Sequence, residues 1–347
     1  MKTALITSVS GQDSLLLSRY LIEEQNYNIY VMGRRVARAL PRAVVELQSN
    51  FPDKYHILHG DITDITAIIN AINIAEPDEF YNLAAQSHVG ISFTESLSTL
   101  QITGFGAVNC IEAVRKTNPN IRFYQAGSSE EFGGVQSVDK GWLDAGQLKN
   151  GIPYIVLNED APLKPKSPYA CAKVLAHNWI ANVREAYGLF ACIGQLFNHE
   201  SVLRKPEFVT RKITIAATEI ALGIRNELRL GTLNFARDFG WAVDYVKAMH
   251  MMLQQQIPTD FVIATGKAYT GEELLTTAFG HYNLDWHKYV KIDNEFSRPS
   301  DVRVLIGDST KAETILGFKH SKTFEQLIKL MCEHDMQTYQ NFGEIVE

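Results

Sequence analysis

The sequence predicts an α/β protein with a doubly wound parallel sheet, joined to a smaller C-terminal α/β lobe. Two observations support this prediction. Short apolar runs alternate with amphipathic segments of helical length through about the first 197 residues, which is the pattern of a parallel sheet with helices on both faces. Beyond that point the alternation becomes irregular and the loops lengthen. We interpret this change as a second lobe that covers the carboxyl ends of the strands, where such sheets bind ligands.

The first part of the chain contains apolar runs of strand length, separated by amphipathic segments of helical length. The predicted strands are residues 4–7, 29–32, 55–58, 80–83, 123–126 and 191–197. The predicted helices lie near residues 14–24, 65–74, 104–117 and 169–187. We therefore expect residues 1–197 to form the sheet domain, with some later segments returning to it.

Residues 198–347 are expected to form most of the second lobe. This part of the chain contains a helical segment near residues 210–222 and short apolar elements around residues 261–264 and 323–333. No internal repeat is recognisable in the sequence. We expect this lobe to hold a substrate against the strand ends of the first domain.

Composition and charge argue against several classes of protein. With 46% hydrophobic and 21% charged residues, the chain is typical of a soluble globular protein. Its net charge of -6 and its scattered lysines and arginines argue against a nucleic-acid-binding face. No apolar run reaches membrane-spanning length, and residues 1–7 are predicted to be a buried strand and not a signal peptide. The four widely spaced cysteines form no metal-ligand pattern, so we expect reduced thiols in the cytoplasm.

The pair Tyr169 and Lys173 is the most informative local pattern. The two residues are four positions apart, which places both side chains on one face of a helix. Ser167 and Pro168 are typical of an N-cap and a first helical position, so Tyr169 is predicted to lie in the first turn. A neighbouring ammonium and the positive end of the helix dipole both favour the phenolate. We therefore expect Tyr169 to act as a base near neutral pH, well below its ordinary pKa of about 10.

The turn after the first predicted strand has the position of a phosphate-binding turn. A Rossmann-type dinucleotide-binding fold places glycines there and holds the cofactor diphosphate at the start of the next helix. Of the glycines in this pattern only Gly11 is present, and Ser8 and Ser14 occupy the other positions. We predict that the cofactor contacts in this turn come from Ser8, Ser10, Gly11, Gln12 and Asp13.

The ends of the next strands indicate which dinucleotide is bound. An NAD-selective site usually places a carboxylate after the second strand, to bond the ribose hydroxyls. Here the chain has Arg34 and Arg35, and two guanidinium groups suit a 2′-phosphate far better than a free diol. The predicted cofactor is therefore NADP. Asp61 and Ile62 are predicted to flank the adenine. The segment after the fourth strand supplies small residues where the backbone approaches the cofactor, namely Leu83, Ala84, Ala85, Gln86 and Ser87.

Longer stretches, spread over most of the chain, share the pattern of one enzyme family. They are residues 11–13, 34–35, 81–89, 123–130, 167–173, 196–201, 208–213, 237–238, 244–246, 260–266 and 298–299. Through them the chain resembles the extended short-chain dehydrogenase/reductases and, within these, the GDP-mannose 4,6-dehydratase family. The blocks at residues 198–201 and 208–213 are specific to that subgroup, whereas the Tyr169 and Lys173 pair marks only the wider superfamily.

The resemblance implies roles for residues that the local patterns do not assign. The residues implied in catalysis are Ser128, Glu130, Tyr169 and Lys173. His199 and Arg204 are implied as cofactor contacts. The residues implied in binding a GDP-linked sugar are Ser87, Ser128, Asn198, Val209, Lys212, Arg237 and Arg298, the last of them on the diphosphate.

The implied reaction is an internal redox sequence that removes water. Tyr169 would take the proton of the sugar's 4-hydroxyl while hydride passes to NADP, and Ser128 would hydrogen-bond the 4-oxygen. Glu130 would then remove the C5 proton and protonate the departing 6-hydroxyl, after which hydride returns to C6. The product is a 4-keto-6-deoxy sugar. The neighbouring Glu131 is expected to face away as a structural residue, because adjacent residues at a strand end point in opposite directions. His88 is interpreted as structural or supporting.

The chain also departs from the family pattern. Besides the two serines of the phosphate turn, Trp241 replaces a histidine, Thr103 replaces an acid, and the segment between Phe132 and Pro162 is longer than usual. Arg204 is the second of two family arginines, of which the first is missing. These differences leave the substrate open among GDP-mannose, which we favour, GDP-N-acetylglucosamine and a GDP-heptose. They also leave open a sugar-nucleotide epimerase or reductase, which releases no water, and a non-catalytic NADP-binding relative.

The resemblance further implies self-association. Family members pair through two long helices, which correspond here to the segments 104–117 and 169–187. The loop at Arg34 and Arg35 often extends such a dimer to a tetramer, and residues 36–40 are apolar enough for this contact. We therefore expect a homodimer or a homotetramer.

Overall fold

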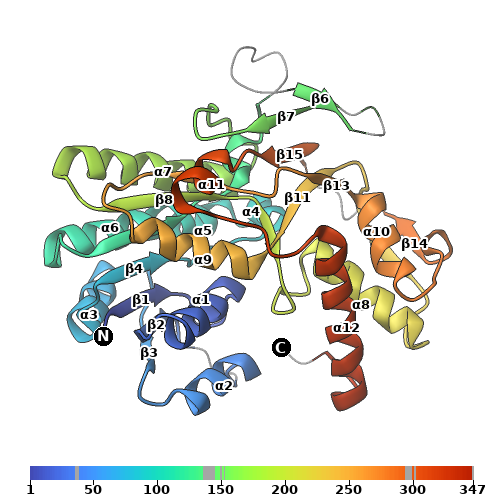
Figure 1. Ribbon diagram of the computed structural model, residues 1–347, viewed down its shortest axis with the longest axis horizontal. Coiled ribbons are helices and arrows are strands. Elements are labelled where there is room, and N and C mark those ends of the chain that lie inside the picture. Colours follow the sequence, from blue (N-terminus) through green and yellow to red (C-terminus); the bar gives the residue numbers. More distant parts are fainter. Residues whose placement is uncertain are drawn as a thin grey trace.

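The computed structural model describes residues 1–35, 39–135, 145–148, 151, 153–293, 299–300 and 302–345. Its centre is a seven-stranded parallel sheet with the strand order β12-β8-β5-β4-β1-β2-β3 (Figure 1). The strands are β1 (Thr3–Thr7), β2 (Asn28–Gly33), β3 (Tyr55–His59), β4 (Glu79–Asn82), β5 (Arg122–Ala126), β8 (Ala191–Leu196) and β12 (Phe261–Ile263). The strand order reverses between β1 and β4, so the predicted doubly wound α/β fold is confirmed.

Helices cover both faces of this sheet. One face packs against α1 (Gln12–Glu23), α2 (Arg42–Asn50), α9 (Ala242–Leu253) and α11 (Thr310–Leu316). The other face packs against α3 (Ile65–Ala75), α6 (Gly106–Thr117) and α7 (Pro168–Tyr187). Successive strand side chains alternate between the two layers: Tyr81 and Tyr124 lie in the first, whereas Phe80 and Phe123 lie in the second. Because all the strands of this sheet are parallel, their carboxyl ends lie along one edge.

Strand β12 corrects one expectation from the sequence. Residues 261–264 were expected in the second lobe, but Phe261–Ile263 pair with β8 and form the last strand of the main sheet. Helix α11, which comes later in the chain, also packs on β12 and α9. A short, buried apolar run is compatible with either sheet, and its periodicity alone does not tell which partner strand it joins.

Helix α7 begins where the sequence predicts. The Ser167 side chain accepts a hydrogen bond from the N–H of Ala170, and Pro168 occupies the first helical position. The helix ends at Gly188, whose φ of 68° lies in the left-handed region that glycine adopts at little cost. Tyr169 is therefore held in the first turn, beside the carboxyl ends of the strands.

The second lobe is built around three helices that share one apolar core. These are α8 (Val209–Ala221), α10 (Gly271–Gly280) and α12 (Phe324–Phe342), and beside them lies the parallel pair β10 (Leu228–Leu230) and β14 (Val290–Ile292). Figure 1 shows these helices beyond the edge of the main sheet that carries the strand ends. Within the described part of the chain, none of the helices has the length and apolar character needed to cross a bilayer.

A second sheet joins the two lobes. Its strands have the order β13-β11-β15-β7-β6, and β9 also pairs with β11. Their bounds are β6 (Ala145–Gln147), β7 (Pro153–Leu157), β9 (Asn198–Glu200), β11 (Ala236–Trp241), β13 (Ala268–Thr270) and β15 (Val304–Gly307). Strand β9 starts two residues after β8 ends, so its ladder with β11 fixes the second lobe over the ends of the main strands. Strands β6 and β7 belong to the segment between Phe132 and Pro162, which the sequence analysis interprets as longer than usual.

Short elements complete the described structure. They are α4 (Val89–Thr94), α5 (Ser96–Thr99), the π-helix η1 (Leu100–Phe105), the 3-10 turn η2 (Ser129–Phe132) and the 3-10 turn η3 (Trp286–Lys288). The helix expected from residue 104 therefore starts as the end of η1 and continues as α6. Element η1 packs against α7, and η2 follows the end of β5, at the edge formed by the carboxyl ends of the strands.

Candidate active site

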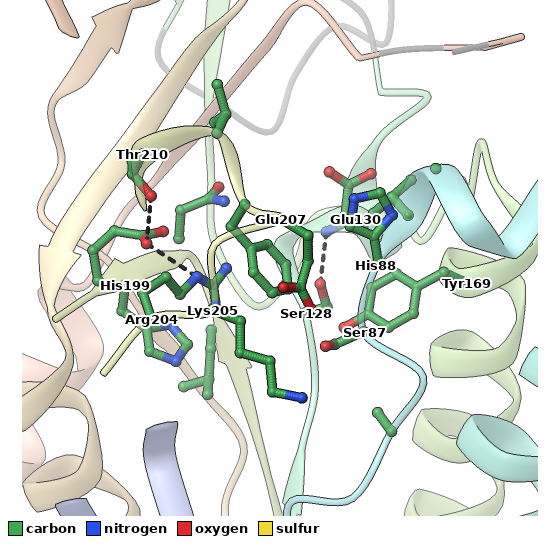
Figure 2. Close-up of a pocket in the computed structure, with 18 of the residues that line it drawn as sticks. Ser87, His88, Ser128, Glu130, Tyr169, His199, Arg204, Lys205, Glu207 and Thr210 are labelled. Carbon is green, nitrogen blue, oxygen red and sulfur yellow. Dashed lines mark hydrogen bonds and ion pairs between the residues drawn. The ribbon is translucent and has the colours of Figure 1, made fainter. Parts of the chain in front are cut away.

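A cavity of about 760 Å³ lies at the carboxyl ends of β1, β4, β5 and β8 and beneath the second lobe. Its walls come from both lobes, with the strand ends on one side and residues of β9, α8 and β11 on the other. Figure 2 shows Glu130 and Tyr169 on one wall, His199 and Arg204 on the opposite wall, and Ser128 between them. The two-lobed arrangement therefore encloses a site of the size expected for a small-molecule ligand.

Helix α7 presents Tyr169 and Lys173 to this cavity. Both side chains are almost fully buried, at 8% and 4% exposure, and both line the cavity wall. The Lys173 ammonium donates a hydrogen bond of 2.6 Å to the main-chain oxygen of Ala126 at the end of β5. It lies 5.7 Å from the centre of the Tyr169 ring. The one-turn spacing thus brings both side chains to one face of the helix, as predicted.

The ionisation of Tyr169 differs from the sequence prediction. Burial raises the pKa of the phenol above its ordinary value, and the neighbouring Glu130 carboxylate acts in the same direction. The Ser128 hydroxyl opposes this shift only in part. Burial also lowers the pKa of Lys173 to about 8. The net shift of the phenol pKa is therefore upward and not downward as predicted, because a sequence pattern does not reveal how strongly the ring is desolvated.

Ser128 and Glu130 follow strand β5. Ser128 is the N-cap of the 3-10 turn η2, and Glu130 lies within that turn. The Ser128 side-chain oxygen accepts a hydrogen bond of 3.2 Å from the main-chain N–H of Glu130, and the same hydroxyl lowers the pKa of the Tyr169 phenol in part. Because the oxygen accepts that N–H, its own hydrogen stays available to a phenol or substrate oxygen. Both residues line the same cavity as Tyr169. Glu130 therefore lies on the same side of the sheet as the tyrosine.

Glu131 points away from the cavity into the protein interior. Its side chain is fully buried, and its carboxylate accepts a hydrogen bond of 2.8 Å from the N–H of Ser128. A second contact of 2.9 Å joins this carboxylate to the His177 ring. The expectation that Glu131 faces away and that Glu130 faces the site is confirmed by these contacts. The cause is the 3-10 turn, however, and not the alternation of a strand.

The phosphate turn is stabilised by its two serines. Ser8 adopts the left-handed backbone conformation, with a φ of 90°, which a glycine would adopt without strain. Its side-chain oxygen accepts a hydrogen bond of 3.1 Å from the N–H of Gly11, and the Ser14 hydroxyl donates one of 2.5 Å to the Ser8 carbonyl. A Cβ atom on Gly11 would lie 2.7 Å from the Ser8 hydroxyl oxygen, so a larger residue there would force that hydroxyl to move.

The start of helix α1 fits a dinucleotide diphosphate. Gly11 is the N-cap of this helix, and no described side chain caps it. The first-turn N–H groups of a helix without a side-chain cap, together with its dipole, favour an anion. Ser10, Gly11 and Gln12 line the cavity at this point. The turn can therefore hold a diphosphate although its glycine pattern is incomplete.

Asp13 and His199 join the phosphate turn to the second lobe. The His199 Nε2 atom lies 3.0 Å from an Asp13 carboxylate oxygen, and the ring stacks on Tyr245 with centroids 4.6 Å apart. Burial opposes ionisation of Asp13, but the attraction of His199 outweighs it and lowers the carboxyl pKa to about 2. Burial likewise lowers the pKa of His199, but Asp13 raises it above its ordinary value. Both residues line the cavity, and their side chains form an ion pair across the lobes.

Some of the predicted cofactor residues after β4 line the cavity, and the others hold the loop that forms its wall. Leu83, Ala85 and Ser87 line the cavity. The N–H of Ala84 donates a hydrogen bond of 3.0 Å to the Thr7 hydroxyl, as does the N–H of Leu83. Gln86 is held by its loop: its N–H donates to the Thr103 hydroxyl, and its side chain bonds the main chain of His88. Thr103, which stands where the family has an acid, therefore supports this loop.

The residues predicted to bind the adenosine end lie beyond this cavity. Arg34 and Arg35 are exposed directly after β2. The Asp61 carboxylate accepts hydrogen bonds from the N–H and hydroxyl of Thr63, and Ile62 is buried in the core on the α6 side of the sheet. None of these four predicted contacts, all within the described residues, lines the cavity of Figure 2.

Most of the predicted substrate residues gather on the second-lobe wall. Asn198, Val209, Lys212 and Arg237 all line the cavity. Burial lowers the pKa of Lys212, and the charge of Arg225 lowers it further. The Arg237 guanidinium donates to the main-chain oxygens of Ala236 and Arg303. Arg298, which was expected on the diphosphate, lies outside the described residues.

The wall also contains charged residues that sequence reasoning missed. Lys205 and Glu207 line the cavity between the lobes (Figure 2). Arg204, which was predicted, is held next to them by an ion pair of 3.0 Å with Glu200 and lies 3.6 Å from the centre of the Phe208 ring. In the sequence, the one indication that Lys205 and Glu207 belong to the site was their position next to the predicted cofactor contact Arg204.

Comparisons with known proteins agree with this geometry. The family model described as GDP-mannose 4,6 dehydratase matches residues 5–331. The chain is 40% identical to GDP-mannose 4,6 dehydratase 2 of Arabidopsis thaliana, over 97% of this chain and 87% of that protein. It is 36% identical to GDP-mannose 4,6 dehydratase of Homo sapiens, over 96% of this chain and 91% of that protein.

The fold also resembles solved structures of more distant enzymes. The dTDP-glucose 4,6-dehydratase of Bacillus anthracis superposes with a TM-score of 0.79 at 18% identity, covering 99% of this chain and 97% of that chain. At that level of identity the likeness supports the fold alone. The matched family model and the full-length relatives go further: this chain belongs to the GDP-mannose 4,6-dehydratase family, a family of hydro-lyases.

Proposed function

We propose that the protein is an NADP-dependent 4,6-dehydratase that converts GDP-mannose to GDP-4-keto-6-deoxymannose. One observation carries this proposal. The Glu130 carboxylate lines the same cavity as Tyr169, Ser128 and Lys173. A plain reductase or a 4-epimerase uses the phenol, the ammonium and the hydroxyl but has no need of a base for the C5 proton. The added carboxylate therefore favours elimination of water over simple oxidation and reduction.

The cofactor would be held along the strand ends. The uncapped start of α1 would hold the diphosphate through main-chain N–H groups of the turn that contains Ser8, Ser10 and Gly11. Arg34 and Arg35 would bind a 2′-phosphate by charge-assisted hydrogen bonds, with Asp61 and Ile62 at the adenine. When bound, NADP supplies the acceptor for the C4 hydride and the donor for C6. All other steps of the reaction are assigned to side chains of this chain.

The first proton is taken by Tyr169. The buried phenol has a raised pKa, so its conjugate base, once formed, is a strong acceptor for the proton of the sugar's 4-hydroxyl. The Ser128 hydroxyl stabilises the oxygen at C4, because its hydrogen remains free to donate while its oxygen accepts the Glu130 N–H. A donor placed in this way contributes about 3 kcal/mol of transition-state stabilisation in comparable sites. Lys173 holds α7 against β5 through Ala126.

The second proton is taken by Glu130. A ketone at C4 acidifies the C5 proton, and the carboxylate in the cavity is the base that removes it. The same group then protonates the 6-hydroxyl, which departs as water. Electrons balance within the sugar, since C4 is oxidised and C6 is reduced. The product therefore has one water less than the substrate, and there is no net oxidation or reduction.

The GDP part of the substrate would lie against the second lobe. Asn198, Val209, Lys212 and Arg237 form that wall, and cations there suit a diphosphate. The experiment that tests the proposal is incubation of the protein and NADP with a panel of GDP-sugars. Mass spectrometry should show loss of one water from GDP-mannose. Water loss only from GDP-N-acetylglucosamine or a GDP-heptose would change the sugar, and an epimerised product of unchanged mass would contradict the proposed reaction.

We also propose that the protein forms a homodimer through α6, α7 and the neighbouring η1. Large apolar side chains on these elements are exposed, at 51% for Phe105, 42% for Trp179 and 58% for Tyr187. Burying such residues against a second copy of the same helices is favourable. The expected extension to a tetramer involves the loop at Arg34 and Arg35 and residues 36–40, of which residues 36–38 lie outside the described residues.

A further inference from the structure

A buried carboxylate lies directly behind the proposed catalytic residues. Glu131 is fully buried, and it forms a capping box with Ser128: the serine N–H donates to Glu131 Oε1 over 2.8 Å. The other oxygen, Oε2, lies 2.9 Å from His177 Nδ1 and 3.5 Å from the Gln195 amide nitrogen. A Cβ atom on Gly127 would lie 2.9 Å from Oε1. The carboxylate is therefore packed tightly beneath the backbone that carries Ser128.

His177 connects this carboxylate to the helix of the proposed base. Tyr169, Lys173 and His177 are spaced by four residues along α7, so the three side chains form one stripe on the helix. The first two face the cavity and the third bonds Glu131. The pair thus ties α7 to the turn η2 at a point one helical turn beyond Lys173.

The charge of Glu131 reaches both titratable groups on the stripe. Burial is the largest influence on Tyr169 and Lys173, but the negative charge of Glu131 raises the pKa of each of them. Burial lowers the pKa of His177, whereas Glu131 raises it to a net value above the ordinary one. A protonated His177 balances the Glu131 charge. A neutral His177 leaves that charge unbalanced.

The other charged groups that face His177 are on the edge of the sheet. Asp260 raises the pKa of His177 and Arg184 lowers it. Those two residues bond each other in a two-pronged ion pair, with both distances at 2.7 Å. Because they largely neutralise each other, Glu131 is the dominant charge acting on the His177 ring.

We propose that Glu131 and His177 are positioning residues that hold Ser128 and set the local charge under which Tyr169 accepts its proton. The inference rests on the proposed function, because it concerns the pH dependence of that dehydration. Glu131 touches neither the cavity nor a reacting atom, and it acts through Ser128 and through its charge. The protonation of His177 then decides whether the site has one unbalanced negative charge beneath the phenol.

Two variants with opposite expected effects test this role. Glu131→Gln keeps an oxygen acceptor for the Ser128 N–H but removes the charge, so the limb on which the rate rises with pH should move to lower pH by about half a unit or more. His177→Asn keeps an amide donor close to the position of Nδ1 but cannot be protonated, so the rate should fall below that of the wild type over the pH range in which the wild-type His177 carries its proton. The control is Glu79→Gln, which neutralises another fully buried carboxylate at the far end of the sheet and should leave the profile in place.

The outcomes separate this inference from the proposed function. If the wild-type protein releases no water from any GDP-sugar, the proposed function fails. If it is active and both variants keep the wild-type pH profile while losing only thermal stability, Glu131 and His177 are merely structural and the inference is overturned. A readout independent of activity is the NMR titration of the His177 ring, whose pKa should fall in Glu131→Gln. An unchanged His177 titration would overturn the charge coupling in an active or an inactive enzyme.

Discussion

The Lys173 ammonium donates a 2.6 Å hydrogen bond to the carbonyl oxygen of Ala126, and this bond fixes the first turns of α7 against the end of β5. Ser128 follows Ala126 by two residues, and Tyr169 precedes Lys173 by one helical turn. The bond between Lys173 and Ala126 therefore helps to bring the Ser128 hydroxyl close to the Tyr169 phenol.

Replacing Glu130 by glutamine removes the base for the C5 proton and retains the shape of the side chain. Oxidation at C4 should still take place, whereas elimination should slow by about 10²-fold to 10⁴-fold. The variant should accumulate 4-keto sugar and reduced cofactor, measured by mass spectrometry and by absorbance of the reduced nicotinamide. The control is Glu185→Gln, an exposed carboxylate of α7, which should turn over normally. Full turnover by Glu130→Gln would refute the assigned base.

Lys173→Met should abolish turnover without unfolding the protein. Burial lowers the pKa of Lys173 from 10.5 to about 8, so the folded chain loses this proton at lower pH than the unfolded chain. Between these values the unfolded chain binds more protons, and the stability of the wild type relative to Lys173→Met must rise with pH. Below about pH 8 the buried ammonium lowers stability by its full amount.

Denaturant titrations of wild type and Lys173→Met from about pH 7 to about pH 10 measure this difference in the free energy of unfolding. The exposed Lys116→Met on α6 is the matched control, and its difference from wild type should not vary over the same window. A constant difference for Lys173→Met would show that the ammonium is not desolvated.

The pair Asp13 and His199 should stabilise the contact between the lobes. The lowered pKa of Asp13, about 2 against 3.8, gives stabilisation that is complete above about pH 4 and is lost as pH falls toward 2. The raised pKa of His199 gives stabilisation present below 6.5 and lost as pH rises through the raised value. A double-mutant cycle with Asp13→Asn and His199→Asn at about pH 5 to 6 should give a coupling of about 1–3 kcal/mol. Additive effects at that pH would argue against the ion pair.

Ser8→Gly should tighten NADP binding. The Ser8 hydroxyl oxygen accepts the N–H of Gly11, a donor that a diphosphate at this turn would otherwise use. Removing that hydroxyl frees the donor, and one charge-assisted hydrogen bond corresponds to about tenfold in Kd. The substitution also relieves the left-handed strain at φ 90°, which offsets the lost bond to within about 1 kcal/mol.

Isothermal titration of NADP into Ser8→Gly and wild type tests this prediction. Ser10→Gly is the matched control, because Ser10 has no left-handed backbone to relieve. It should lose stability and gain no affinity. Weaker binding by Ser8→Gly would mean that the serine hydroxyl itself contacts the cofactor.

Trp179→Arg should separate a dimer that forms through α7. Trp179 is 42% exposed, and a guanidinium facing its own copy across a symmetric interface is repelled. Size-exclusion chromatography with light scattering should give the mass of the single chain for this variant and twice that mass for wild type. Ile257→Arg, at a residue that is 74% exposed and belongs to no helix or strand, is the control and should remain dimeric.

The sequence predicted the elements whose signals are local. The spacing of Tyr169 and Lys173, the Ser167 and Pro168 start of α7, and the alternating strands of the first domain all appear at the predicted places. Glu131 also turns away from the cavity as predicted, but through the 3-10 turn η2 and not through strand alternation. These features depend on caps, helical spacing and apolar periodicity, which act over a few residues and are visible in any one segment.

Other features depend on partners far away in the chain. Strand β12 joins the main sheet by pairing with β8, and α8 and α9 lie between these two strands in the chain. His177 meets Glu131 only because α7 crosses η2, and Lys205 and Glu207 enter the cavity only because β9 and β11 seat the second lobe over it. No local pattern specifies such meetings.

The sequence by itself therefore determined the fold class, the family and the four side chains proposed for catalysis. Only the tertiary structure decided how those side chains are solvated and charged: the raised pKa of Tyr169, the lowered pKa of Lys173, and the buried carboxylate beneath Ser128. The physical reason is that burial and long-range charge act through space, between groups brought together by packing, whereas a sequence pattern records only neighbours along the chain.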